Sequence, residues 1–294
     1  MAALATPPVF EKGDVVITQY IDFVWTLPVA RPAMHLTRDA QPKAALDRVV
    51  DVAFMSDRVY VLRESSLDVF DRSMHLIASR EMYWKFDIEA GSNGRLYLAG
   101  LPYQGIRDIT VLDRDGQEAE TLQLPFVYGP IDVAGCILFS DDWQQVNRYD
   151  VCQHKALSSI AAPGLLSSAG LPDGGVVVGG RGFLDVYDAS GTHLRRRTIG
   201  DGHSGIGPIA FADDGRSIWL WQGGDVAKVS LRGGGEFARV DAPEAYLLAV
   251  ADEQRPGSAA ALASLEAVPT LSIPSLAALA FLLVTFAVLA LRAR

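Results

Sequence analysis

The chain has 294 residues, of which 49% are hydrophobic, and its formal net charge is −9. That length and composition can supply a sizeable buried core, whereas the acidic balance argues against nucleic acid as a partner, because a phosphate backbone requires a basic surface. The two cysteines, Cys136 and Cys152, are too few for a small disulfide-rich scaffold or a cysteine-rich zinc site.

Residues 1–9, "MAALATPPV", carry small residues before the first strand pattern. We interpret them as an N-terminal remnant, the end of a signal peptide whose charged n-region and apolar h-region are not in this sequence. The alternative is that the C-terminal tail described below serves as the insertion signal.

Turn signals recur through the middle of the chain, and each precedes a β-rich run such as "RVYVL" or "RSIWLW". The second residues of these turns are Asp57, Gly94, Gly135, Gly174 and Gly215. Their separations are 37, 41, 39 and 41 residues. A period of about 40 residues is typical of the four-stranded blades of a β-propeller.

A second landmark follows four of these runs, where an aspartate ends the next strand and can bind its own backbone to start a turn. These aspartates are Asp71, Asp113, Asp150 and Asp188. Ser230 stands in the same place in the fifth copy, before a glycine turn. The recurrence of both landmarks in step supports a repeat architecture.

The two ends of the repeat region indicate the number of blades. "KGDVVIT" at 12–18 supplies a turn and an inner strand without a preceding partner, and "LLAVADEQ" at 247–254 repeats "PIAFADDG" at 208–215 without a successor. We therefore predict an all-β fold, a six-bladed propeller over residues 10–254 that the N- and C-terminal strands close. Sandwich and solenoid folds are the alternatives, because they also use short strands at regular spacing.

The "DG" turns and the "VYD" strand end at 186–188 resemble those of the NHL and related six-bladed propellers. This resemblance extends over residues 10–254 and implies the same ring architecture.

The two cysteines belong to one predicted blade. Cys136 begins the strand "CILFS" and Cys152 follows "VNRYD", so a hairpin around "SDDWQQ" brings them near each other. A turn centred near Asp142 sets them a few residues out of register, whereas a wider loop reaching Val146 places them opposite. The sequence leaves open a disulfide bridge and a pair of buried thiols.

We find no catalytic, cofactor-binding or metal-binding set in the sequence. The histidines lack metal-ligand spacing and are expected at the surface; they are His35, His75, His154, His193 and His203. "GDGHSGIG" at 200–207 is interpreted as an inter-blade loop, and "SDDW" at 140–143 as a solvated turn. The tryptophans are expected to pack between sheets; they are Trp25, Trp84, Trp143, Trp219 and Trp221.

No charged residue occurs from Val268 to Leu291, a run long enough to cross a bilayer. We predict a linker over 255–267 and a single C-terminal transmembrane helix within 273–291 that contacts membrane lipid. Arg292 and Arg294 follow as a membrane stop, and the positive-inside rule places them in the cytoplasm and the ring on the other side.

Residues 268–294 resemble the IPTL-type C-terminal sorting domain of exported Gram-negative bacterial proteins, in which a short motif precedes an apolar span and a basic end. The motif falls on Val268, Pro269, Thr270, Leu271 and Ser272. Valine replaces the usual isoleucine at 268, and residues 273–274 are Ile-Pro where that family has an acidic residue and tryptophan. The resemblance implies export, anchorage in the inner membrane and recognition by a sorting or processing enzyme.

Two classes of function remain. The first is a noncatalytic binding or structural module of the bacterial cell envelope, with a protein or glycan as ligand. The alternative is a metal-dependent envelope hydrolase or lactonase of the six-bladed propeller type. In both cases the ring is expected in the periplasm on a single-pass inner-membrane anchor, or sorted onward to the cell surface.

Overall fold

The computed structural model describes most of the ring and little of the tail. The described residues are 9–19, 22–24, 27–29, 31–100, 107–124, 130–200, 202–231, 236–243, 245–251, 253 and 255. Within them every regular element is a strand, and the strands form six four-stranded antiparallel sheets and one two-stranded hairpin. The predicted all-β, six-bladed propeller is confirmed.

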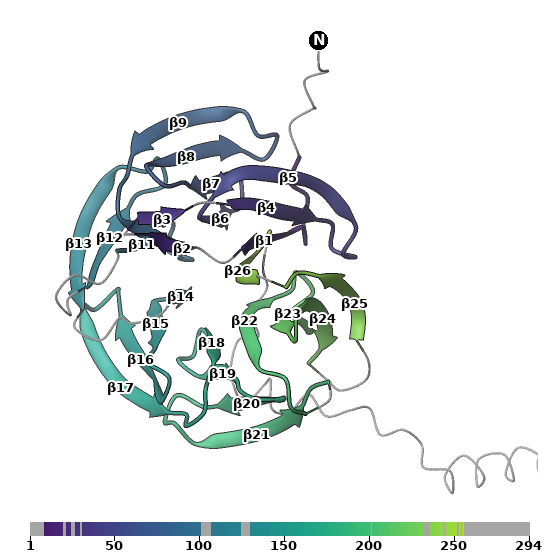
Figure 1. Cartoon of the computed structure of the whole chain (residues 1–294). Coiled ribbons are helices and arrows are strands. Elements are labelled where there is room, and N and C mark those ends of the chain that lie inside the picture. The colour runs from purple at the N-terminus through teal and green to yellow at the C-terminus, as the bar shows by residue number, and fades with distance from the viewer. Residues whose placement is uncertain are drawn as a thin grey trace, which may run out of the picture.

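The six sheets are arranged radially around the centre of the ring (Figure 1), and the word channel below refers to this centre. Blade 1 combines β26, β1, β4 and β5, and blades 2 to 6 each take four consecutive strands. The innermost strands of blades 1 to 6 are β26 (Ala245–Val250), β6 (Asp51–Met55), β10 (Lys85–Ala90), β14 (Ile131–Ala134), β18 (Ser167–Gly170) and β22 (Ile206–Phe211). The second strands are β1 (Val15–Gln19), β7 (Arg58–Leu62), β11 (Leu96–Gly100), β15 (Ile137–Asp141), β19 (Val176–Gly179) and β23 (Ser217–Gln222).

The two outer positions of each blade complete the ring. The third strands are β4 (Arg31–Leu36), β8 (Ser66–Asp71), β12 (Arg107–Leu112), β16 (Gln145–Asp150), β20 (Phe183–Tyr187) and β24 (Asp225–Ser230). The fourth strands are β5 (Pro42–Val49), β9 (Leu76–Glu81), β13 (Glu118–Leu124), β17 (Lys155–Ala161), β21 (His193–Thr198) and β25 (Glu236–Asp241).

The ring closes through both ends of the chain. Strand β26 pairs antiparallel with β1, with Val15 opposite Val250 and Ile17 opposite Leu248. The predicted closure is thus confirmed, with one correction: residues 12–18 do not form an inner strand, because β26 takes the position beside the channel and β1 lies second.

The hydrophobic core is divided among the blade interfaces. Alternate residues of each strand face opposite neighbours, as strand geometry requires. In β7, Val59 and Val61 pack with blade 1, while Tyr60 and Leu62 pack with blade 3. Six such buried clusters occur in the described residues, one between each pair of adjacent blades. Each blade is therefore stabilised by both neighbours, and an open ring would expose two of these surfaces.

The predicted turn aspartates end the third strands as expected. The Asp71 carboxylate accepts hydrogen bonds from the Ser73 and His75 amides at 2.8 and 2.9 Å. Asp113, Asp150 and Asp188 each accept two amide hydrogen bonds in the same way. This turn chemistry repeats because each third strand must reverse direction within a few residues.

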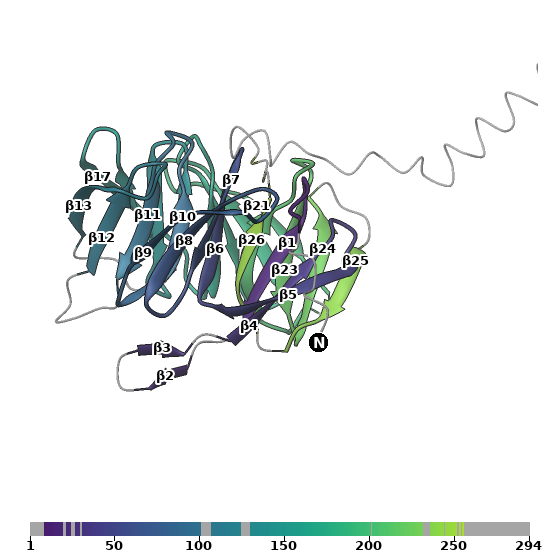
Figure 2. The same ribbon diagram turned by 90° about the horizontal axis from the view of Figure 1, so that it is seen from above.

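The repeat pattern does not predict the hairpin of β2 (Asp22–Val24) and β3 (Leu27–Val29), which is inserted between β1 and β4. Figure 2 shows it projecting from one face of the ring. We call this the hairpin face. The opposite face carries the turns between the first and second strands of the blades, and we call it the cavity face.

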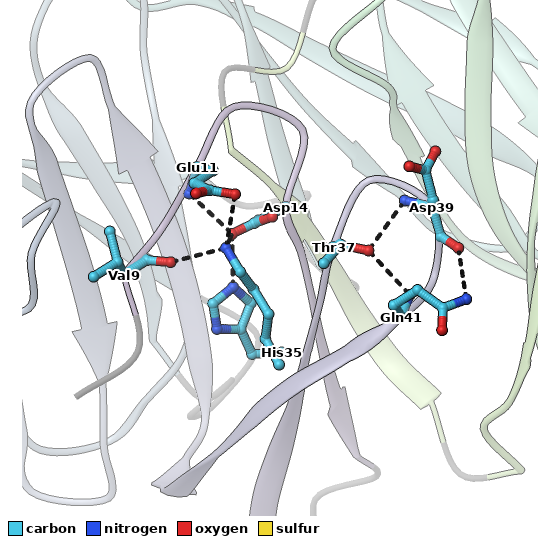
Figure 3. Close-up of polar contacts among 8 residues, drawn as sticks. Val9, Glu11, Asp14, His35, Thr37, Asp39 and Gln41 are labelled. Atoms are coloured by element: carbon cyan, nitrogen blue, oxygen red, sulfur yellow. Dashed lines mark hydrogen bonds and ion pairs between the residues drawn. The ribbon is translucent and has the colours of Figure 1, made fainter. Parts of the chain in front are cut away.

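Blade 1 contains a buried polar cluster near the point of closure. The Asp14 carboxylate accepts hydrogen bonds from the Glu11 amide at 2.9 Å and from Lys43 Nζ at 2.8 Å, and it lies 2.9 Å from Nε2 of His35 (Figure 3). The prediction of a surface position is wrong for His35, which is fully buried, and the ring of Phe10 stacks on it at 4.2 Å. Burial is possible because Asp14 satisfies one ring nitrogen.

Cys136 and Cys152 form a disulfide bridge with a Cα separation of 5.5 Å. Cys136 lies opposite Val151, whose amide donates to its carbonyl at 2.8 Å, so the two cysteines are one position out of register across the ends of β15 and β16. The bridge joins two neighbouring turns of blade 4.

No helix in the described part of the chain is long and apolar enough to span a membrane. The predicted linker after Arg255, the motif at 268–272, the span at 273–291 and the terminal arginines lie outside the described residues.

Candidate functional site

Carboxylates from the inner strands connect neighbouring blades around the channel. An inner strand has one unpaired edge, and its buried amides need acceptors. The Ile88 amide donates to Asp51 at 2.9 Å, the Ile131 amide to Asp87 at 2.5 Å, and the Gly170 amide to Asp132 at 2.5 Å. On three consecutive inner strands, an aspartate thus accepts an amide hydrogen bond from the inner strand of the next blade.

A fourth carboxylate reaches the ring from the other end of the chain. Glu253, three residues beyond β26, accepts the Phe211 amide of β22 at 2.7 Å. Between β18 and β22 the link is a hydroxyl, because Ser167 Oγ donates to the Ile206 carbonyl at 3.2 Å.

Burial governs the protonation of these acids. Burial raises the pKa of Asp51 well above its usual range, and the neighbouring Asp87 carboxyl raises it further. Burial also raises the pKa of Asp87, to about 6, although its hydrogen bond with Asp51 opposes the shift. The proximity of the two buried carboxyl groups therefore favours the neutral form of at least one of them. The pKa of Glu89, on the same strand as Asp87, is raised by burial and by Asp132.

Arg255 supplies one positive charge of the site, at the end of the chain's last described segment. Its guanidinium binds Asp132 through two bonds of 2.6 Å, donates to the Gly170 carbonyl at 2.9 Å and contacts Glu253 at 3.1 Å. Burial lowers the pKa of Arg255, but the Asp132 and Glu253 carboxylates raise it by more, so the group remains charged.

A cavity of about 630 Å³ opens beside Arg255 on the cavity face. Its walls include the turns after β6, β10 and β14 together with residues from the end of β26. Glu89, Glu253 and Arg255 line it, as does Asp57, whose carboxylate pairs with Arg114. A concave site with converging polar groups at a channel mouth is the usual place for a ligand on such a fold.

Among the described residues, none of the histidines and tryptophans considered above lines this cavity; Trp25 lies outside the described residues. His75 is exposed, and His193 binds Asp185 on the outside of blade 5 at 3.0 Å. Trp219 is fully buried between blades 6 and 1, whereas Trp84 and Trp143 are exposed. In the described residues no group of three or more His, Cys, Asp or Glu side chains could hold a metal ion.

The channel carboxylates did have a signal in the sequence. "DVA" at 51–53, "DIEA" at 87–90 and "DVA" at 132–134 each place an aspartate within the inner strand of a successive blade, 36 and 45 residues apart. An aspartate among apolar strand residues is uncommon, and its recurrence at the blade period is the pattern that would have identified the site.

The fold places the chain in the class of six-bladed β-propellers. It is similar to a protein of unknown function from Bacteroides caccae, with 12% identity and a TM-score of 0.60 over 83% of this chain and 100% of that chain. It is also similar to a functionally unknown protein from Desulfotomaculum acetoxidans DSM 771, with 12% identity and a TM-score of 0.54 over 75% of each chain. At such low identity these similarities show the fold alone. No family profile and no curated protein matches the chain.

Proposed function

We propose that the chain is a noncatalytic binding module of the bacterial cell envelope, built on an NHL-like ring. The observation that supports binding is the cavity of about 630 Å³ on the cavity face, whose wall carries Asp57, Glu89 and Glu253 together with Arg114 and Arg255. A charged lining favours a protein ligand with charged side chains over a neutral glycan.

The proposed location rests on the sequence of the tail. An IPTL-type motif at 268–272, a lipid-contacting span at 273–291 and the arginines at 292 and 294 suit an exported ring on an inner-membrane anchor. A sorting or processing enzyme acting on this tail would release the ring toward the cell surface.

Reporter fusions test the location. A reporter inserted just before Val268 and another after Arg294 should report opposite sides of the inner membrane. A cytoplasmic signal from both would overturn the proposal.

Elemental analysis of the purified full chain tests the noncatalytic role. We expect no stoichiometric divalent ion and no lactone hydrolysis. One ion per chain, together with hydrolysis that a chelator removes, would replace the binding role with the metal-dependent hydrolase.

A further inference from the structure

The groups that surround the Arg255 guanidinium form a recognition pocket. We propose that this pocket is a binding site for the arginine side chain of a peptide ligand, and that Arg255 occupies it from within the same chain. The inference rests on the proposed binding function and specifies the chemistry of the ligand.

The contacts match the shape of a guanidinium group. Two of its nitrogens bind the two oxygens of Asp132 at 2.6 Å each, and the same nitrogens also donate to the Gly170 carbonyl and to Glu253. The Phe211 ring lies 5.7 Å from the guanidinium carbon. A bidentate carboxylate, additional acceptors and an aromatic ring favour arginine over lysine, whose ammonium is a compact point charge.

The ring positions this pocket independently of Arg255. Asp132 and Glu253 are also held by the Gly170 and Phe211 amides, and the aspartate, the glycine and the phenylalanine come from three different inner strands. The pocket is therefore preorganised, which lowers the free energy needed to admit a ligand.

Access to the pocket comes from the cavity. Arg255 and Glu253 both line the space of about 630 Å³, and their side chains are 14% and 21% exposed. The guanidinium is thus at the boundary between the channel and an opening large enough for several residues of a peptide. The Glu89 carboxyl lies on the same wall and adds a polar group to it.

Arg255 competes with any external arginine. It follows Glu253 by two residues, so its effective concentration at the pocket is of the order of millimolar or higher. An external ligand must displace it, and the full chain should bind a simple arginine compound only weakly until Arg255 is removed.

The test uses the full chain with Arg255→Ala, and Nα-acetyl-arginine-N-methylamide as the probe in titration calorimetry. We expect one binding site in the variant, with at least tenfold higher affinity than in the unmodified chain. The matching lysine compound should bind the variant at least tenfold more weakly than the arginine compound. Equal affinity of the probe for both chains, or of both compounds for the variant, would overturn the inference.

A second variant tests the assigned residue. Arg255→Ala combined with Asp132→Asn should lose probe binding, because asparagine can still accept the Gly170 amide but cannot form the bidentate ion pair. If Arg255→Ala lowers the folded fraction, thermal unfolding replaces the titration. The probe should then raise the unfolding midpoint of Arg255→Ala and leave the midpoint of the double variant unchanged. An equal effect of the probe on the two midpoints would also overturn the inference. These readouts are independent of the reporter fusions and the metal analysis, so failure here leaves the proposed function standing.

Discussion

At the scale of single residues, Asp87 predicts how stability depends on pH. Its pKa is raised from 3.8 to about 6, so the folded chain binds more protons than the unfolded chain between these values. The unfolding free energy contributed by this group therefore falls as pH rises from about 4 to about 6.

Asp87→Asn should remove this dependence. Asparagine can keep the Ile131 amide bond and carries no charge. We therefore expect the variant to gain about 3 kcal/mol above pH 7 and nothing below pH 4, because each unit of the pKa shift corresponds to about 1.4 kcal/mol. Denaturant unfolding at several pH values measures the unfolding free energy as a function of pH. Asp39→Asn removes an exposed carboxyl and is the control, so its plot should have the slope of the unmodified chain. The prediction would be contradicted if the plot for Asp87→Asn also had that slope.

Gly170 has no room for a side chain. A Cβ atom there would lie 2.2 Å from the ring of Phe139, which is fully buried. Gly170→Ala should lower the unfolding free energy by about 1–3 kcal/mol, as overpacking typically does. Chemical denaturation measures the loss. Adding Phe139→Leu should recover part of it by making space, and an additive loss in the double variant would show that the contact is not responsible.

At this scale the sequence was informative where the chemistry is local. The turn aspartates could be predicted because Asp71 and its counterparts bind amides only two to four residues away. The channel acids could not be assigned partners in the same way, because Asp51 binds an amide 37 residues away and Arg255 binds an aspartate 123 residues away. Those pairs depend on the curvature of the ring.

At the scale of elements, the disulfide of blade 4 is predicted to stabilise the hairpin of β15 and β16. The two cysteines are 16 residues apart in the sequence, and for a loop of this length the chain-entropy model gives a stabilisation of about 3 kcal/mol. Replacing Cys136 and Cys152 by serine should lower the denaturant midpoint by a corresponding amount, and reduction of the unmodified chain should have the same effect.

Thiol labelling provides the direct check of the bridge. Unfolded, unreduced chain should show no reactive thiol, since both cysteines are in the bridge. Two labelled cysteines in this material would contradict the prediction. The sequence could place the two cysteines in one blade, but their pairing depended on a register that turn signals alone do not determine.

At the scale of the whole molecule, the ring should depend on β26 and not on the tail. Removing residues 245–254 would expose the edges of β1 and the surfaces buried in clusters with blades 6 and 2, so this truncation should aggregate or lose cooperative unfolding. Ending the chain after Arg255 should do neither. Size-exclusion chromatography and thermal unfolding compare the two truncated chains. Equal aggregation and equal unfolding cooperativity of both would contradict a ring that β26 closes.

The architecture could be predicted because the repeat period, the two incomplete ends and the strand alternation all indicate one closed ring. The β2–β3 hairpin could not, because it interrupts blade 1 without a counterpart in the other blades, and a repeat pattern contains no information about an insertion that occurs once.

Closure by β26 also determines when the ring can form. Strand β1 is among the first strands to be synthesised, whereas its inner neighbour is added more than 220 residues later. Until then blade 1 has three strands, and the inner edge of β1 stays uncovered, as do the parts of blades 2 and 6 that pack on β26. The complete ring therefore cannot form before β26 has been synthesised, and until then the nascent chain carries an unpaired strand edge that can pair with other strands.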